Sequence, residues 1–152
     1  MTTLPVGDEI VLELPEGATS VEGAVDESRH LTPEGLSVIT RAIGPFADRE
    51  MALGIVQAHV GELVHHYQLR EEAVRRGPLV FEVTGSRHAE ALLLELGTGG
   101  TSLAVMLIVV GVLTETGQVA IVEIVWPTAL NTALAPKAQS ILDSITLASM
   151  GA

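Results

Sequence analysis

The sequence predicts an α+β fold in which an antiparallel β-sheet of about six strands is covered by helices on both faces. The main observation is residues 102–126, SLAVMLIVVGVLTETGQVAIVEIVW, two strongly apolar segments joined by Thr-Glu-Thr-Gly. Residues 103–113 are apolar without alternation, so a strand here buries side chains on both faces and needs a layer on each side of the sheet. Two amphipathic helical segments, residues 49–66 and a final one beginning near Pro136, are available to supply those layers.

The N-terminal part of the chain predicts three strands. Residues 9–14 alternate apolar and other side chains until Pro15-Glu16-Gly17 ends the run, and residues 21–25 hold a weaker second strand. Residues 36–43 read as the third strand, closed by Gly44-Pro45. These strands precede the first helix.

The central helix is predicted from residue 49 to residue 66, about five turns, with Asp48 as its N-cap. Its apolar positions follow a helical period, so one face must be buried. They are Leu53, Val56, Val60, Leu63, Val64 and Tyr67.

Strands follow the central helix at residues 69–74, 79–84 and 89–96, before the two long apolar segments. Glu115-Thr116-Gly117 is a connection short enough to close a hairpin. Strands joined by short loops pair antiparallel, because parallel pairing needs a long crossover. The final helix is then defined by apolar side chains at Leu134, Ala138, Ile141, Leu142 and Ile145.

Length and composition limit the function classes. The 152 residues form one domain, residues 1–152, and the absence of cysteine excludes disulfides and thiolate chemistry. The formal net charge of -11 argues against nucleic acid and anionic membranes as partners, and leaves a merely solvated acidic surface or a basic partner. Residues 1–9 show no signal peptide and no apolar run is long enough for a membrane helix, so we expect a cytoplasmic protein without membrane insertion.

Three motifs of the chain match a known pattern: Leu-Pro-Glu-Gly at residues 14–17, the turn Gly-Ser-Arg-His-Ala at residues 85–89, and Ile-Leu-Asp-Ser-Ile at residues 141–145. With these motifs the chain resembles the DcrB-related, PsbP-like family of small α/β/α sandwiches. The resemblance covers nearly the whole chain. It implies a mainly non-catalytic role, since family members act as adaptors, photosystem subunits, lipoproteins or Eag-type chaperones that hold apolar transmembrane segments of secretion effectors.

The central helix carries a candidate metal site. His59, Glu62 and His66 lie three and four residues apart and fall along one helix face, with His65 adjacent. A zinc or nickel site needs three or four converging ligands, and no His-Glu-x-x-His motif is present. The interpretation preferred here is a solvated helix edge, with no metal or cofactor.

Glu123 is the acidic residue embedded in a strongly apolar strand. A buried carboxylate there has a raised pKa and is a candidate for acid/base chemistry. The preferred alternative is that Glu123 points to a rim or a partner, or pairs with an arginine. Glu82 and Glu95 lie in the preceding predicted strands, and the three acids are candidates to line one face of the sheet.

Other chemistry finds no support in the sequence. There is no Gly-x-Ser-x-Gly, and Ser86, Ser102, Ser140 and Ser144 stand in turn, strand-start or helix contexts. Residues 97–100, Gly-Thr-Gly-Gly, lack the Lys-Ser/Thr of a phosphate-binding loop and lead into a strand.

The sequence therefore predicts a protein that acts by binding. The leading hypothesis is a non-catalytic adaptor or chaperone-like protein that engages a protein partner through apolar surface, the partner being basic or apolar, and that forms a homodimer. The alternatives are a small-molecule or lipid carrier and an enzyme with Glu123 as its acid or base.

Overall fold

The structure is a computed structural model that describes residues 2–21, 27–70, 73–75, 77–97 and 104–148. It contains two helices, ten strands and one short 3-10 turn in these ranges. The N-terminal strands are β1 (Thr2–Val6), β2 (Ile10–Leu14), β3 (Thr19–Val21), β4 (Glu27–Leu31) and β5 (Ser37–Ile43). After α1 (Arg49–Arg70) come β6 (Ala73–Arg75), β7 (His88–Leu96), β8 (Val105–Leu113), β9 (Val119–Pro127), η1 (Thr128–Leu130), α2 (Asn131–Asp143) and β10 (Thr146–Leu147).

The main sheet has seven strands in the described part of the chain, in the order β3-β4-β5-β9-β8-β7-β6. All neighbouring pairs are antiparallel, as predicted from the short connections. The long apolar hairpin forms the centre of the sheet, and β8 is buried on both faces from Met106 to Leu113. A smaller sheet, ordered β1-β2-β10, joins the two ends of the described chain.

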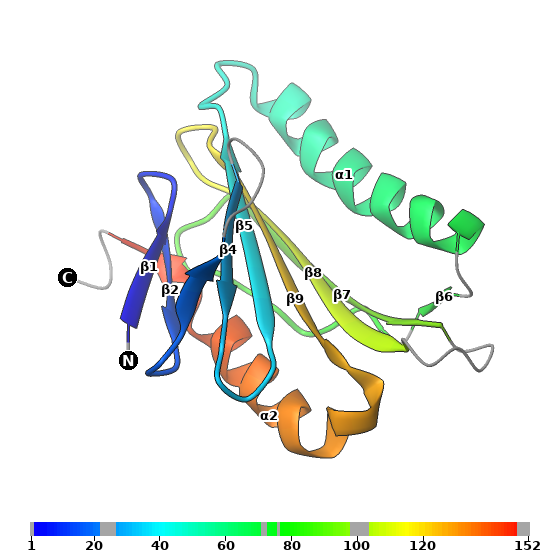
Figure 1. Cartoon of the computed structure of the whole chain (residues 1–152). Coiled ribbons are helices and arrows are strands. Elements are labelled where there is room, and N and C mark those ends of the chain that lie inside the picture. Colours follow the sequence, from blue (N-terminus) through cyan, green and yellow to red (C-terminus); the bar gives the residue numbers. More distant parts are fainter. Residues whose placement is uncertain (1, 22–26, 71–72, 76, 98–103, 149–152) are drawn as a thin grey trace.

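The two helices pack against different side chains of the central strands. Ala52 and Val56 of α1 are buried against Leu113, Val119 and Ile121. The buried residues of α2 instead share a core with β8 and β9 residues of the opposite pleat and with the small sheet. These are Leu134, Ala138, Ile141 and Leu142 from α2, Val110, Val112, Val122 and Ile124 from the main sheet, and Ile10, Leu12 and Leu14 from β2. Figure 1 shows α1 and α2 on different sides of the main sheet. This second layer is thus shared between a helix and a sheet.

Gly111 determines how closely α1 approaches the main sheet. A Cβ atom added at Gly111 would lie 2.5 Å from Cγ1 of Val56, well inside van der Waals contact. The absent side chain therefore leaves the space that Val56 fills, and α1 rests on β8 at this point.

Several predicted elements have different boundaries in the structure. Asp48 caps α1 as predicted, since its Oδ1 accepts from the backbone N–H groups of Glu50 and Met51. The helix continues to Arg70, so the strand predicted at residues 69–74 is reduced to β6. Helix α2 begins at Asn131 rather than near Pro136, so Pro136 lies inside the helix and Leu134 is buried in its first turn.

The strand predicted at residues 79–84 is absent. Residues 77–83 are irregular, although the Leu79 N–H donates to the Ala91 carbonyl of β7 at 2.9 Å. The side chains in this segment alternate as they would in a strand, since Leu79 and Phe81 pack against the core and Val80 is 97% exposed. The segment nevertheless forms no β-ladder. The weak strand predicted at residues 21–25 overlaps β3 only at Val21, and the rest lies outside the described residues.

Candidate functional site

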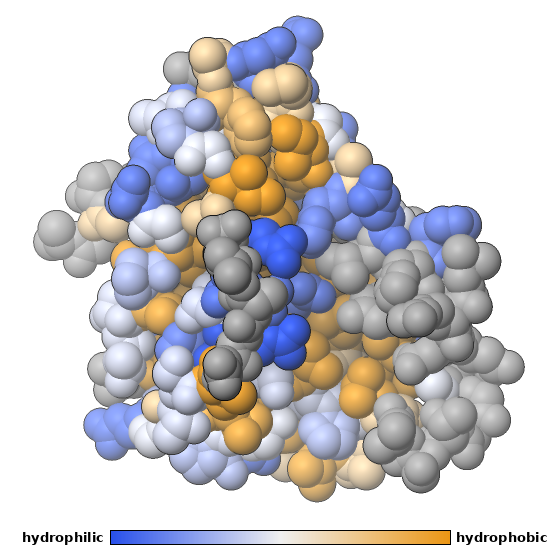
Figure 2. All heavy atoms as spheres, turned by 45° about the horizontal axis from the view of Figure 1, so that its top comes forward, coloured by the Kyte–Doolittle hydropathy of each residue, from blue (hydrophilic) through white to orange (hydrophobic). Residues whose placement is uncertain are grey.

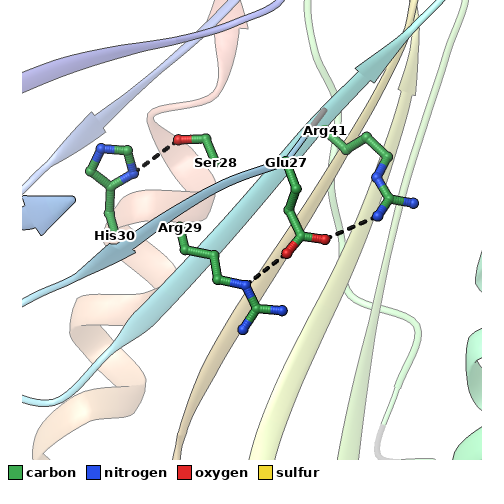
Figure 3. Close-up of polar contacts among 5 residues, drawn as sticks. All are labelled: Glu27, Ser28, Arg29, His30 and Arg41. Carbon is green, nitrogen blue, oxygen red and sulfur yellow. Dashed lines mark hydrogen bonds and ion pairs between the residues drawn. The ribbon is translucent and has the colours of Figure 1, made fainter. Parts of the chain in front are cut away.

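A charged cluster lies on the face of the main sheet that α1 contacts. Its geometry follows from strand register, because Glu27 of β4 lies opposite Arg41 of β5, and Arg29 is two residues further along β4 on the same face. Glu27 Oε1 accepts from Arg29 Nε at 2.7 Å and its Oε2 accepts from Arg41 Nη2 at 3.0 Å (Figure 3). The Glu27 side chain is only 9% exposed, whereas the two arginines are 48% and 38% exposed.

Glu123 of β9 adds a second carboxylate to the charged cluster. It pairs in register with Ile39, one step along β5 from Arg41 on the same face. Burial raises the pKa of Glu123, and the neighbouring Glu27 carboxylate raises it further, while Arg41 and Arg29 oppose the change. In contrast, the hydrogen bond from Arg29, with the help of Arg41, holds the pKa of Glu27 below its ordinary value. The pKa values of these two neighbouring carboxyl groups are thus shifted in opposite directions.

His59 of α1 lies next to the charged cluster. It lines a cavity of about 10 Å³ together with Glu27, Arg41 and Glu123, which is room for about one water molecule. Its Nε2 is buried and has no hydrogen-bond partner among the described residues. Burial lowers the pKa of His59, and Arg41 lowers it further, whereas Glu62 opposes the change. The cavity has no room for anything larger than a water molecule.

The other candidate residues do not form a site with Glu123. Glu95 pairs in register with Met106 of β8, whereas Glu123 pairs with Val109 of β8. Side chains at these two β8 positions point to opposite faces of the sheet. Glu82 is exposed in the irregular segment. The predicted row of acids on one face is therefore wrong.

The helix histidines are separated by the way α1 lies on the sheet. His59 faces the charged cluster, while Glu62 and His65 are exposed. The side chain of His66 lies outside what the structure describes. Within the described residues, no three acidic or histidine side chains are arranged to hold a metal ion.

A groove lies on the other flank of α1, between the helix and the edge of β7. It measures about 580 Å³ and its lining is mostly apolar. The described lining residues are Gln57 and Gly61 from α1, Gly77 and Pro78, and Glu90, Ala91 and Leu92 from β7. Figure 2 shows one face of the molecule, on which a strongly hydrophilic area lies between apolar areas. Helix α1 thus has the charged cluster on one flank and an open, mostly apolar groove on the other.

The Glu27 ion pairs were not predicted from the sequence, and a pocket between sheet and helix was raised only as part of the carrier alternative, without its residues. Residues 27–31, Glu-Ser-Arg-His-Leu, are polar on both pleats and gave no strand signal. The position of the groove had a usable signal in Gly61, because glycine inside a helix is unfavourable and calls for a reason.

No protein-family model matches the chain, and the search of curated proteins finds no relative. Solved structures with a similar fold are known. Cyanobacterial PsbP (CyanoP) from Synechocystis sp. PCC 6803 is similar with a TM-score of 0.65 and 10% identity, over 94% of this chain and 89% of that one. LpqN, involved in cell envelope biogenesis of Mycobacterium tuberculosis, gives a TM-score of 0.61 with 13% identity, over 96% and 89%. The Saccharomyces cerevisiae Ran-binding protein Mog1p gives 0.56 with 14% identity, over 90% and 88%. These likenesses establish a PsbP-like fold.

Proposed function

We propose that the protein is a non-catalytic binding module of the adaptor or chaperone-like kind, and that it engages a protein partner through the groove between α1 and β7. The observation that supports this most directly is the groove itself, an open, mostly apolar concavity of about 580 Å³. Exposed apolar concavities are typical of interaction sites rather than of inert surface.

The chemistry of the rest of the molecule supports binding over catalysis. The pair Glu27 and Glu123 has the divergent pKa values that acid/base catalysts use. However, the cavity that they share holds about one water molecule, so it leaves no room for a substrate between the two carboxylates. The similar fold of Mog1p, a Ran-binding protein, is consistent with protein binding on this architecture.

A small-molecule or lipid carrier is the second candidate. The groove volume lies within the range of about 300–1,000 Å³ that small-ligand pockets occupy. The described helices include none with the length and hydropathy of a membrane-spanning segment. A cytoplasmic location and a homodimer remain predictions.

Site-specific photocrosslinking tests the proposal. Because the chain has no cysteine and Gln57 is exposed in the groove, a benzophenone attached at Gln57→Cys labels the groove alone. A probe at Gln139→Cys, on the exposed side of α2, is the matched control. We expect a discrete protein adduct from position 57 in extracts of the cells that carry the gene, none from position 139, and loss of the adduct when Gly61→Trp fills the groove.

Two results would overturn the binding function. The first is a bound small molecule, detected by native mass spectrometry and displaced by Gly61→Trp, which would identify a carrier. The second is turnover of a substrate that Glu123→Gln abolishes while Gly61→Trp leaves it intact, which would identify an enzyme.

A further inference from the structure

The contact between α1 and the charged cluster contains a buried nitrogen without a partner. His59 Nε2 is buried and makes no hydrogen bond to the described residues. It lines the cavity of about 10 Å³ whose charged lining comes from three strands, Glu27 of β4, Arg41 of β5 and Glu123 of β9. A buried polar atom beside a polar cavity of this size is the usual setting of an internal water molecule, which makes about three hydrogen bonds. The geometry thus favours a water molecule that joins His59 to the sheet.

The Glu27 carboxylate is not free to balance a proton on His59. Both of its oxygens are occupied, since Arg29 Nε donates to Oε1 and Arg41 Nη2 donates to Oε2. Burial lowers the pKa of His59, and the Arg41 guanidinium lowers it further, whereas Glu62 of α1 opposes the change from an exposed position. The folded molecule therefore favours the neutral ring.

Glu123 also faces the cavity and competes for the same proton. Burial raises the pKa of Glu123, and Glu27 raises it further, against the effect of Arg41 and Arg29. When the pair of Glu123 and His59 holds one proton, burial favours the uncharged arrangement, a protonated carboxyl group beside a neutral ring, over two opposite charges. His59 accordingly takes up the second proton.

Two glycines weaken α1, the helix that carries His59. Gly54 and Gly61 lie inside the helix, where glycine is unfavourable, and a Cβ atom added at either would meet nothing within 4 Å. Packing among the described residues thus requires neither glycine. Ala52 and Val56 are the buried contacts of the described part of α1 with the sheet, and both side chains are short. An element of low local stability can open while the rest of a molecule stays folded.

We propose that His59 makes α1 a pH-sensitive element: the neutral ring holds the helix on the main sheet through a water molecule, and protonation of the ring releases the helix. A protonated ring places a further positive charge beside Arg41 in a cavity with room for about one water molecule. Opening of α1 transfers that charge to solvent. The switch does not depend on the proposed binding function. Because α1 forms one wall of the groove, opening also removes the groove, and only this consequence rests on that function.

The direction of the pH dependence follows from the two states of α1. In the open state His59 has its ordinary pKa of about 6.5, whereas in the closed state the ring stays neutral to lower pH. The open state therefore binds more protons, and the closed state loses stability as the pH falls below about 6.5. With a closed state that is still neutral at pH 5.5, the opening constant rises about tenfold between pH 7.5 and pH 5.5. Glu123 acts in the opposite direction, because the closed state binds its proton more tightly.

Amide hydrogen exchange of the full chain measures the opening of α1, once each rate is divided by the intrinsic rate at that pH. Glu123→Gln isolates His59, because glutamine keeps the size and polarity of the side chain without titrating. In this variant we expect the protection of α1 amides to fall about tenfold from pH 7.5 to pH 5.5, while the protection of α2 amides is unchanged. In the unsubstituted chain the fall should be smaller, since Glu123 takes up a proton.

Further variants identify the titrating group. His59→Gln, added to Glu123→Gln, should abolish the fall in protection because glutamine remains neutral. His65→Gln, added to the same variant, is the matched control, since His65 is exposed on the same helix, and the fall should persist. Circular dichroism confirms that each variant is folded. A ring titration by proton NMR needs no substitution at position 59, and it should give His59 a pKa below its ordinary value of about 6.5.

Four results would overturn the switch: no fall in protection in Glu123→Gln, a fall that persists without His59, an equal fall in α2, which indicates global unfolding, or a His59 ring that titrates in its ordinary range. If exchange shows the switch but the probe at position 57 captures no protein, the switch stands and the binding function fails. If the probe captures a protein but α1 protection does not change with pH, the binding function stands and the switch is wrong.

Discussion

Replacing Gly111 by alanine should push α1 away from β8 and destabilise the protein. The new methyl group would lie 2.5 Å from Val56 Cγ1, where about 3.5–4.0 Å is the favourable carbon–carbon distance. The helix must therefore move by about 1 Å or more. Overpacking of this kind costs about 1–3 kcal/mol, and we expect about 2 kcal/mol for Gly111→Ala.

A double-mutant cycle with Val56 tests the cause of this loss. Val56→Ala alone removes two buried methyl groups and should cost about 2–3 kcal/mol, including the cavity that it leaves. In the double variant the methyl group at position 111 occupies part of that cavity. The loss of unfolding free energy in the double variant should therefore be smaller than the sum of the two single losses by about 2 kcal/mol.

Urea unfolding with linear extrapolation measures the four free energies, with an unchanged m-value as the check that the unfolding transition is the same. Gly54→Ala is the matched control, because its new methyl group meets nothing within 4 Å. Losses that add to within about 0.5 kcal/mol would show that Val56 does not rest on Gly111 and would refute the reasoning.

Two further predictions concern the helix and the charged cluster. Gly54→Ala should stabilise the protein by about 0.5–1 kcal/mol, since it removes unfolded-state entropy at an open helix position; a fall in the thermal midpoint would contradict this. The raised pKa of Glu123 means that the folded state binds its proton more tightly, so the carboxylate destabilises the fold as pH rises through that pKa. Glu123→Gln should therefore raise the urea midpoint at pH 7 and raise it less at pH 4. Glu27 has a lowered pKa and its carboxylate stabilises the fold above the unfolded pKa, so Glu27→Gln should lower the midpoint at pH 7. Midpoint changes of the same sign for the two variants at pH 7 would rule out our assignment of the cluster.

The elements that sequence reasoning predicted well are those with a strong local signal. The hairpin β8–β9 combines uninterrupted apolar residues with a short turn, and Asp48 is a strong capping residue, so both could be predicted without knowledge of their neighbours. Strands β4 and β10 have no such signal. Their residues are strands because β5 and β2 offer backbone partners, and this depends on the tertiary fold.

The candidate site was harder to predict than the fold. Glu123 was identified from its apolar surroundings, and its raised pKa agrees with that reasoning. Its neighbours Glu27 and Arg41 come from two other strands, so they could be identified only once the register of those strands was known. The absence of a common face for Glu95 and Glu123 is likewise a matter of register, since a shift of one residue exchanges the faces.

The pairing of β10 with β2 affects the order in which the molecule can fold. Thr146 lies opposite Val11, the Ala148 N–H donates to the Glu9 carbonyl at 2.8 Å, and Ser144 Oγ accepts from the Glu13 N–H at 2.9 Å. Each contact joins residues more than 130 positions apart, so its loop closes late in folding. On the ribosome, β1 and β2 must wait with their apolar side chains unburied until α2 and β10 have been synthesised. The first strands to emerge are therefore among the last to be secured, and this interval is when the chain is most exposed to aggregation.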